Sequence, residues 1–379
     1  MNGADVVVVG AGPAGLAVGA QLRRAGIPAV LLERSDYIAP AWRTRYDRLR
    51  LNTPRWTSKL PGGRYARGTP LFPSRDEMIA YLEEYAARNE LDVRFGTAVE
   101  RIDRDGSALR VTTSDSELTA PHVIVATGLQ HEPLLPDWPG QDRFGGEVLH
   151  ASRYRNPEPF HDRDVLVVGP GCSGMEIAYD LSRSAARSVR LSVRSAPNIL
   201  LRSLGGVPND IPAMAMMRLP SRVVDAQIGV IRRVALGDLS TYGLPRPQEG
   251  PMTLLRRDGK TPAIVDREMI DAIKAKRVEV VAAVTGVDEQ GVHLADGTSL
   301  EPHAVIAATG YGTGLQRLVG HLDVLDERGM PRVVGGAEAA PGLRFVGFIP
   351  GPAQIRVMGA EARRATKGIA RNARQLATT

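Results

Sequence analysis

Residues 6–15 read VVVVGAGPAG, and this stretch decides the fold. Four consecutive valines are typical of a buried strand in a parallel sheet. The glycines behind them have the spacing G-x-G-x-x-G, and the Ala- and Leu-rich residues 16–25 follow as an expected helix with a Gly-Ile-Pro stop. Residues 29–32 form the next expected strand, and an acid, Glu33, stands 18 positions after Gly15. Strand, glycine turn, helix, strand and acid in this order predict a dinucleotide-binding βαβ unit.

Each position in the glycine turn has its own physical task. Gly10 allows a sharp turn, Gly12 lets a pyrophosphate approach the backbone, and Gly15 lets the helix pack against the strand. The helix N-terminus offers free N–H groups to the phosphates, and the carboxylate of Glu33 can accept hydrogen bonds from both hydroxyls of a ribose. A purely structural glycine turn is the alternative. We predict that an adenine dinucleotide with a free ribose is bound by Gly10, Gly12, Pro13, Ala14, Gly15 and Glu33.

The same pattern occurs a second time at residues 164–174, which read DVLVVGPGCSG. The next expected strand, residues 188–193, ends in Arg194 and Ser195 rather than in an acid. A carboxylate would repel a 2′-phosphate, whereas a guanidinium forms paired hydrogen bonds with one. The second copy therefore favours NADPH, with a solvated surface charge as the alternative role of Arg194. The predicted contacts are Gly169, Gly171, Cys172, Ser173, Gly174, Arg194 and Ser195.

The two copies also end alike. An apolar strand at residues 122–126 leads into Thr127-Gly128, and another at residues 304–308 leads into Thr309-Gly310. Small residues at these places let the chain pass close to a bound dinucleotide, so all four are predicted to contact a cofactor. Each pair is also compatible with an ordinary turn at the end of a strand. The sequence thus contains an internal repeat and predicts an α/β fold with two Rossmann-like dinucleotide-binding domains.

Composition argues against several classes of function. Lys and Arg total 48 against 42 Asp and Glu, a net charge of +6 with no basic run that carries interleaved aromatics, so nucleic-acid binding is not expected. The single cysteine, Cys172, permits neither an internal disulfide nor a thiolate metal cluster, and no metal site is expected. No apolar run approaches the roughly 20 residues of a membrane span. We therefore expect a cytoplasmic protein that acts on small molecules.

A third motif lies between the two copies. Phe144, Gly146, His150 and Tyr154 match the spacing F-x-G-x-x-x-H-x-x-x-(Y/F). With the two dinucleotide sites, this motif makes the chain resemble the FMO-type flavin-containing monooxygenases. Baeyer–Villiger monooxygenases usually carry Trp at the position of Tyr154, so this residue argues against that branch of the family. The chain is most similar to the YUCCA-type subgroup over essentially its whole length, notably at residues 33–39, 46–51, 193–195, 246–251 and 259–262.

The resemblance implies an arrangement of domains and cofactors. FAD is expected in a domain made of residues 1–155 and 301–379, and NADPH in a domain of residues 160–300 that is inserted into it. The implied reaction has NADPH reduce FAD, after which O2 forms a C4a-(hydro)peroxyflavin that oxygenates a small organic substrate. Oxidative decarboxylation of a 2-oxo acid such as indole-3-pyruvate is the example that the subgroup suggests.

The resemblance also implies further site residues. Asn52 is expected beside the flavin as the catalytic side chain, and Arg34, Trp42 and Gln354 are expected to contact FAD. Pro40-Ala41 precede Trp42 where many FMO-type enzymes have a glycine pair.

Several alternatives stay open. Asn52 is also a common turn former before Thr-Pro, and His150 fits either a hinge that fixes the two domains or a satisfied histidine in a packed linker. Residues 212–236 are apolar at helical spacing and fit a membrane-surface helix, a substrate lid or a homodimer face. Competing functions are N- or S-oxygenation of a soft nucleophile, an NADPH oxidase or flavin reductase without oxygen transfer, and a nucleotide-binding sensor. The absence of a C-x-x-C pair argues against a disulfide reductase.

Overall fold

The four valines of the opening stretch form strand β1 (Val6–Val9) in the middle of a six-stranded sheet. The computed structural model describes residues 4–184, 186–216 and 218–376 of the chain. The first sheet has the order β22-β23-β7-β1-β2-β3, and its strands are parallel except for the edge strand β22. The other strands are β2 (Ala29–Leu32), β3 (Val93–Arg94), β7 (His122–Val125), β22 (Glu338–Ala340) and β23 (Leu343–Phe345). All four valines of β1 are buried, as their continuous run predicted.

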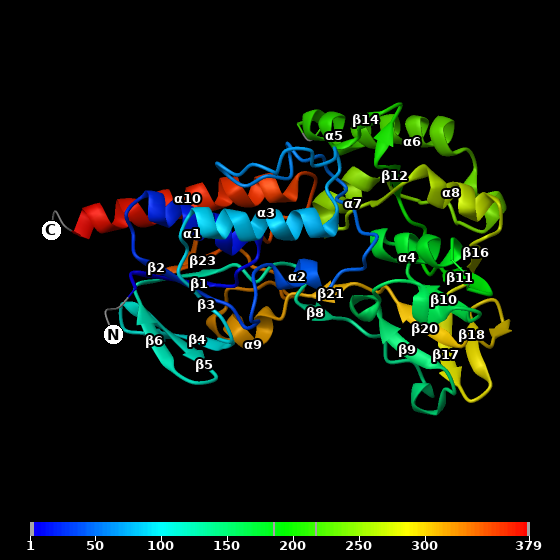
Figure 1. Cartoon of the computed structure of the whole chain (residues 1–379), viewed down its shortest axis with the longest axis horizontal. Coiled ribbons are helices and arrows are strands. Elements are labelled where there is room, and N and C mark those ends of the chain that lie inside the picture. The colour runs from blue at the N-terminus through cyan, green and yellow to red at the C-terminus, as the bar shows by residue number, and fades with distance from the viewer. Residues whose placement is uncertain (1–3, 185, 217, 377–379) are drawn as a thin grey trace.

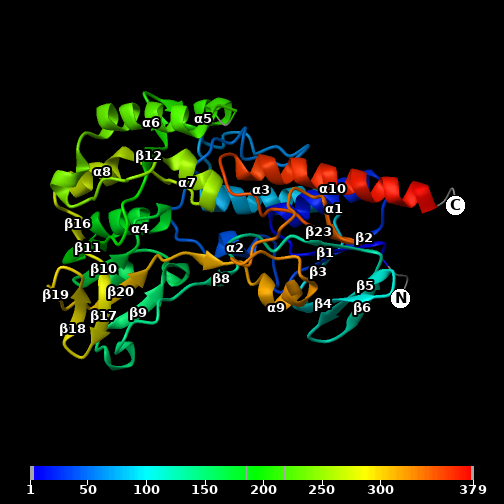
Figure 2. The same ribbon diagram turned by 180° about the vertical axis from the view of Figure 1, so that it is seen from behind.

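Helices cover one face of this sheet, and a meander of three strands covers the other (Figures 1 and 2). Long helices bury Leu16, Leu82 and Ile369 in one shared core, while the meander and a short helix bury Ile102 and Leu315 on the opposite face. The long helices are α1 (Pro13–Arg24), α3 (Arg75–Arg88) and α10 (Gln354–Leu376), and a four-residue helix, α2 (Pro40–Arg43), belongs to the same unit. The short helix on the opposite face is α9 (Leu315–Val319), and the meander is β4 (Val99–Asp105), β5 (Ala108–Thr113) and β6 (Glu117–Ala120).

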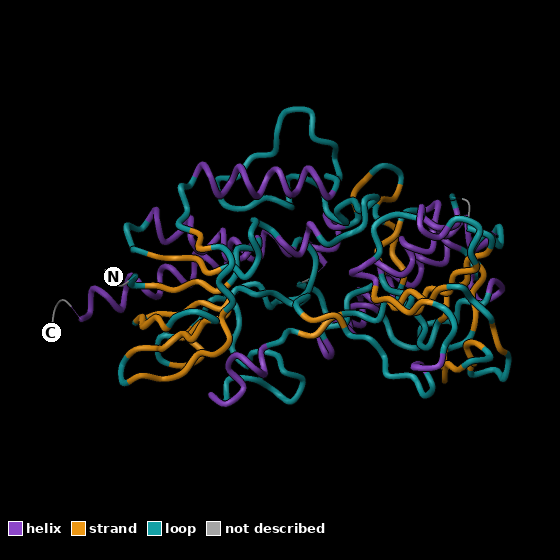
Figure 3. Tube along the Cα trace, turned by 60° about the horizontal axis from the view of Figure 1, so that its bottom comes forward, coloured by secondary structure: helices purple, strands orange, loops and turns teal. Residues whose placement is uncertain are grey.

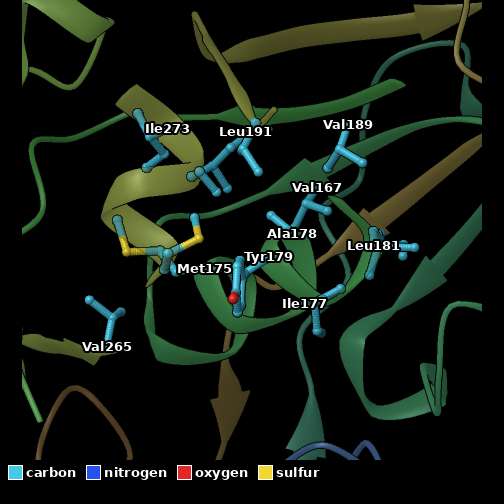
Figure 4. Close-up of a cluster of buried hydrophobic side chains, with 14 of the residues drawn as sticks. Val167, Met175, Ile177, Ala178, Tyr179, Leu181, Val189, Leu191, Val265 and Ile273 are labelled. Carbon is cyan, nitrogen blue, oxygen red and sulfur yellow. The ribbon is translucent and has the colours of Figure 1, made fainter. Parts of the chain in front are cut away.

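The second sheet is parallel throughout and has the order β16-β11-β10-β20-β9. Its strands are β9 (Glu147–His150), β10 (Asp164–Val168), β11 (Ser188–Ser192), β16 (Glu279–Val281) and β20 (Ala304–Ala307). Helices α4 (Cys172–Ser182) and α8 (Arg267–Lys274) pack on one face, where Val167, Met175 and Ile273 share an apolar core (Figure 4). A second meander, β17 (Val284–Asp288), β18 (Gly291–Leu294) and β19 (Ser299–Leu300), packs on the other face.

The two units repeat one arrangement of parts. Strands β10, β11, β16 and β20 occupy the same order as β1, β2, β3 and β7, and each unit carries a meander before the last of these strands. The second unit follows β7 in the chain and precedes β23, which returns to pair with β7 in the first sheet. The second unit is therefore inserted into the first, as expected, and Figure 3 shows the two as separate lobes.

The predicted domain boundaries at residues 155 and 301 do not coincide with the edges of the two sheets. Both β9 and β20 pair in the second sheet, although the prediction placed residues 147–150 and 304–307 in the first domain. The physical reason is that β20 is completely buried and needs a partner on each side. Strand β10 supplies one partner, and β9, from the connecting segment, supplies the other.

The segment 212–236 forms parts of two helices rather than one. Helix α5 (Asp210–Met216) and helix α6 (Ser221–Leu236) are separated by a break that contains Pro220. The remaining elements are β8 (Glu132–Pro133), β12 (Ile199–Leu201), β13 (Ser203–Leu204), β14 (Val207–Pro208), α7 (Pro251–Asp258), β15 (Ala263–Val265) and β21 (Tyr311–Gly312), with 3-10 turns η1 (Gln141–Arg143), η2 (Ala151–Arg153), η3 (Glu158–Phe160), η4 (Leu239–Tyr242) and η5 (Gly320–Leu322). In the part of the chain that the structure describes, no helix combines the length and the apolar character needed to span a membrane.

Candidate active site

The first glycine turn connects β1 to α1. Gly10 has a φ of +105°, and a β-carbon there would lie 3.0 Å from the carbonyl oxygen of Ala126. A β-carbon on Gly15 would lie 1.9 Å from the carbonyl oxygen of Gly10, so only glycine lets α1 pack this closely. Around Gly12, by contrast, no atom lies within 4 Å of the β-carbon position. The backbone of Gly12 is therefore bare at the start of a helix, where a phosphate would be stabilised.

Glu33 directly follows β2, and Thr127 follows β7 after one residue, Ala126; these two strands flank β1. Glu33 is 4% exposed, and its carboxylate accepts hydrogen bonds from the amides of Ala11 at 2.8 Å and Ser35 at 3.0 Å. Glu33 thus fixes the glycine turn and keeps lone pairs for a ribose. The Oγ1 atom of Thr127 is buried, and it has no hydrogen-bond partner among the described residues. Because buried hydroxyls are rarely left unpaired, this one is a candidate ligand contact, next to the positive φ of Gly128.

The second glycine turn repeats the geometry of the first. Gly169 has a φ of +110°, and a β-carbon there would lie 2.6 Å from the carbonyl oxygen of Ala308. A β-carbon on Gly174 would lie 1.9 Å from the carbonyl oxygen of Gly169, while no atom lies within 4 Å of that position at Gly171. Cys172 and Ser173 begin α4. The second turn therefore leaves the same bare backbone at a helix start as the first.

Arg194 and Ser195 follow β11 after one buried residue, and both are exposed. This is the end of the strand where the fold places the ribose of a bound dinucleotide. The position of Arg194 is compatible with the predicted contact to a 2′-phosphate, and that contact stays a prediction.

A segment of the first unit connects the two glycine turns. At one end, the amide of Ala39 donates to the carbonyl of Ala11 at 3.3 Å. At the other end, Nδ2 of Asn52 lies 3.7 Å from Sγ of Cys172, the first residue of α4. The Oδ1 atom of Asn52 is buried without a partner among the described residues. Asn52 therefore lies beside the second turn with a free acceptor, and its catalytic role stays a prediction.

Cys172 is a packing residue with its sulfur enclosed by polar backbone. Its Sγ accepts a hydrogen bond from the amide of Ile264 at 3.2 Å and lies 3.7 Å from the carbonyl of Pro262. Burial raises the pKa of the Cys172 thiol above its ordinary value. The thiol is therefore protonated at neutral pH, which argues against a thiolate nucleophile at this position.

A buried polar chain joins the two units beside this junction. The hydroxyl of Tyr46 donates to Oε2 of Glu176 at 2.9 Å, and Nη2 of Arg202 donates to Oε1 of Glu176 at 2.7 Å. Nη1 of Arg202 lies 3.2 Å from Oδ2 of Asp266. Arg202 is 4% exposed and Glu176 is 9% exposed, so each charge depends on the other for its stability in the interior. Burial raises the pKa of Glu176, and the positive charge of Arg202 opposes this shift.

The sequence analysis did not predict this buried network of hydrogen bonds and ion pairs. Its only trace in the sequence is a glutamate between Met175 and Ile177 in an otherwise apolar stretch of helix, which indicates a buried partner without naming it. The contact of Gly347 with the first turn was also not predicted: its φ is +93°, and its β-carbon position lies 2.9 Å from the Ala14 side chain. The C-terminal part of the chain thus passes directly over the start of α1.

The connection between the units is a pair of short antiparallel strands, β8 and β21 (Figure 1). His150 fixes it, since its Nε2 donates to the carbonyl of Gly310 at 3.0 Å and its Nδ1 accepts from the amide of Ser152 at 3.1 Å. The imidazole is 2% exposed and meets the Tyr311 ring edge-on at 4.9 Å. Both ring nitrogens are satisfied, so His150 is a structural residue of the linker. Burial lowers its pKa, although the bond to Gly310 opposes the shift.

The rest of the linker motif is also structural. A β-carbon on Gly146 would lie 2.6 Å from the ring of Phe144, so the glycine makes room for the aromatic ring. The hydroxyl of Tyr154, which is 1% exposed, donates to Asp180 at 2.8 Å. The hydroxyl of Thr309 donates to the carbonyl of Leu134 in the linker. The polar groups of Thr309 and Gly310 therefore hold the connection, and a cofactor contact of these two residues stays a prediction.

The other residues predicted to contact FAD lie on several elements of the first unit. Pro13 and Ala14 are the first residues of α1, and Trp42, a residue of α2, packs partly buried against the core. Nη1 of Arg34 lies 3.2 Å from Nε2 of His131. Gln354 is the first residue of α10 and is half-buried. No group of three or more His, Cys, Asp or Glu that could hold a metal ion occurs among the described residues.

Comparison with known proteins agrees with this geometry. The chain matches the pyridine nucleotide-disulphide oxidoreductase family over residues 7–199. It is 41% identical over 310 residues to the indole-3-pyruvate monooxygenase YUCCA1 of Oryza sativa subsp. japonica, covering 80% of this chain and 76% of that protein. It is 36% identical over 350 residues to the probable indole-3-pyruvate monooxygenase YUCCA1 of Arabidopsis thaliana, covering 90% of this chain and 84% of that protein.

Solved structures share the fold. A flavin-containing monooxygenase from Stenotrophomonas maltophilia superposes with a TM-score of 0.74 at 26% identity, covering 98% of this chain and all of that chain. OTEMO, solved in complex with FAD and NADP, has a TM-score of 0.75 at 18% identity and covers 98% of this chain and 85% of its own. The chain belongs to the pyridine nucleotide-disulphide oxidoreductase family and, within it, to the YUCCA-type flavin-containing monooxygenases.

Proposed function

We propose that this chain is an FAD- and NADPH-dependent monooxygenase that converts a small aryl 2-oxo acid, such as indole-3-pyruvate, to the acid shorter by one carbon. One atom of O2 enters the new carboxylate and the other leaves as water, the carboxyl group leaves as carbon dioxide, and NADPH supplies the two electrons. The names of relatives that are 36–41% identical support this substrate class. N- or S-oxygenation of a soft nucleophile is the alternative that the experiment below distinguishes.

The observation that carries the proposal is the pair of bare glycines, Gly12 and Gly171. Each begins a helix at the end of a buried parallel strand, and each has open space where a side chain would stand. Buried polar atoms without partners lie near them, at Thr127 and Asn52, in the part of the chain that is described. Bare helix starts with unpaired polar groups nearby fit two dinucleotides.

The charged residue beside each glycine turn indicates which cofactor that turn would bind. The first turn and Glu33 would hold FAD, because an acid at this place suits a free ribose. The second turn and Arg194 would hold NADPH, because a guanidinium suits a 2′-phosphate. When bound at these two turns, the cofactors would supply hydride transfer and the reducing power for activation of O2.

The residues between the turns position the reactants and exclude water. Asn52 would hold the nicotinamide amide or the oxygen-bearing group through its free Oδ1 and its Nδ2. Leu51 is 4% exposed and Tyr46 is 4% exposed, and Tyr46 is bonded across the unit boundary to Glu176. A dry junction matters because water at this place would favour release of hydrogen peroxide over oxygen transfer.

The experiment that tests the proposal is a turnover assay under ¹⁸O2. The purified protein, loaded with FAD, receives NADPH together with indole-3-pyruvate, a tertiary amine or a thioether, and the products and hydrogen peroxide are measured. We expect one ¹⁸O atom in indole-3-acetate and little peroxide. Label only in an N-oxide or S-oxide would replace the substrate class, and NADPH consumption with peroxide as the sole oxygen product would contradict oxygen transfer.

A further inference from the structure

A cavity of about 320 Å³ lies in the second unit, away from the junction between the glycine turns. We call it the α6 pocket. It is enclosed by the C-terminal half of α6, by residues 237–247 and by two residues that follow β11, Pro197 and Ile199. All of its lining residues fall between positions 197 and 247, so none belongs to the first unit. Its volume is in the range of small-molecule sites.

The walls of the α6 pocket are mainly apolar. Ile199, Leu239 and Leu244 contribute aliphatic side chains, and three prolines, among them Pro197, contribute rigid ring surfaces. Gly229 on α6 has no atom within 4 Å of its β-carbon position, so the helix leaves open space at that position. Flat apolar walls of this kind suit a ligand with a flat apolar body.

The polar groups of the α6 pocket are mostly cationic. Its lining contains Arg232, Arg233 and Arg246 against a single acid, Asp238. Arg246 is paired with Asp238, which also accepts hydrogen bonds from Ser240. Arg232 is half-buried, and no hydrogen-bond or ion-pair partner is found for it in the described parts of the chain. Burial lowers the pKa of Arg232, yet an arginine in this setting stays charged at neutral pH.

A half-buried cation without a partner is expensive unless something neutralises it. Exposed arginines need no partner because water solvates them, but Arg232 is partly withdrawn from water on the pocket side of α6. We propose that the α6 pocket binds a small organic anion with a flat apolar body, whose anionic group pairs with Arg232. The apolar walls select the body of the ligand, and Arg233 adds charge at the rim.

Two molecules share this chemistry. Pro197 stands three positions after Arg194, so one wall of the pocket continues directly from the predicted 2′-phosphate contact, and the 2′-phosphoadenosine end of a dinucleotide is one candidate ligand. A free aryl carboxylate has the same combination of a flat body and an anionic group. The proposal concerns binding, so it stands or falls independently of whether the protein transfers oxygen.

The test is calorimetric titration of the FAD-loaded full chain with 2′,5′-ADP and, separately, with indole-3-acetate. We expect at least one of them to bind, and Arg232→Gln to weaken that binding about 10- to 100-fold through loss of a charge-assisted hydrogen bond. Gly229→Leu should weaken it similarly by filling the pocket, since leucine is well accepted in a helix. The matched control is Arg222→Gln, an exposed arginine on the same helix that does not line the pocket, which should change the Kd less than twofold.

A competition experiment with NADP⁺ distinguishes the two candidate ligands. Indole-3-acetate that still binds at saturating NADP⁺, and that Arg232→Gln weakens, places an independent anion in the pocket. 2′,5′-ADP that NADP⁺ displaces, and that Arg232→Gln weakens, places the adenosine end of the dinucleotide there. Either result upholds the proposal, whereas 2′,5′-ADP binding that Arg232→Gln leaves unchanged belongs to the Arg194 site and counts against it. The proposal is overturned when neither ligand binds the wild-type protein, or when binding is unchanged in both Arg232→Gln and Gly229→Leu.

Discussion

Replacing Gly12 with alanine should weaken FAD binding on the order of 100-fold while leaving the apoprotein folded. Gly12 has a φ of −79°, which any residue adopts, and no atom lies within 4 Å of the β-carbon position. The new methyl group therefore strains nothing in the protein itself. It occupies the space that a pyrophosphate needs, and an overlap of this size costs about 2 to 3 kcal/mol, on the order of a 100-fold loss of affinity.

The matched control is the same substitution three residues further along. In Gly15→Ala the new methyl group would lie 1.9 Å from the carbonyl oxygen of Gly10, inside the van der Waals contact of backbone atoms. Because α1 and β1 must separate to admit it, we expect the apoprotein to lose about 1 to 3 kcal/mol or more of unfolding free energy. Gly12→Ala should lose little, since it creates no contact.

The assay compares deflavinated proteins, because bound FAD would itself raise the stability of the wild type. Flavin absorbance relative to protein absorbance gives the FAD content after reconstitution, and urea denaturation of each apoprotein gives its unfolding free energy. Gly12→Ala that binds FAD like the wild type would refute the reasoning. So would a loss of apoprotein stability in Gly12→Ala as large as that in Gly15→Ala.

Four further predictions follow from the site and the unit boundary. Arg194→Glu should raise the KM for NADPH far more than that for NADH in steady-state kinetics, and equal effects on both would remove the proposed 2′-phosphate contact. Asn52→Ala should lower oxygen transfer about 10- to 100-fold and raise the hydrogen peroxide formed per NADPH, with unchanged FAD content by absorbance; coupling equal to the wild type would exclude the proposed role. Arg202→Ala should reduce the unfolding free energy in urea by about 3 to 5 kcal/mol, because it leaves the buried carboxylate of Glu176 without its counter-charge, and a loss below 1 kcal/mol would contradict this. Because burial lowers the pKa of His150, the unfolded chain takes up its proton first as the pH falls below about 6.5, so neutral His150 contributes stability above that pH that is lost below it. His150→Gln should therefore flatten the decline of the urea-measured unfolding free energy between about pH 7 and pH 5, and an unchanged slope would show that His150 does not titrate there.

The parts of the fold that the sequence predicted are those set by local rules. The turns at Gly10–Gly15 and Gly169–Gly174 follow from backbone sterics over a few residues, and the structure confirms the helix starts and close packing that these glycines allow. The internal repeat was visible because both copies keep the same order of strand, glycine turn, helix and strand. The insertion of the second unit followed from the family resemblance.

The parts that the sequence did not predict depend on pairs that are distant in the chain. The pairing of β9 with β20 joins segments more than 150 positions apart, so no local pattern placed residues 147–150 in the second sheet. The hydroxyl of Thr309 donates to Leu134, 175 positions away, although its local pattern indicated a cofactor contact. Thr127, in the equivalent place, has its hydroxyl unpaired among the described residues, so the two Thr-Gly pairs are distinguished only by the folded structure.

The central claim is that the two glycine turns hold different dinucleotides and bring a nicotinamide up to a flavin. Its most direct test is anaerobic stopped-flow mixing of the FAD-loaded protein with NADPH, for the wild type and for Gly171→Ala. The account predicts that NADPH bleaches the flavin of the wild type rapidly, and that Gly171→Ala keeps its FAD but needs a much higher NADPH concentration for the same rate. A wild-type flavin that NADPH does not bleach, or a Gly171→Ala protein that is reduced with unchanged concentration dependence, would contradict it.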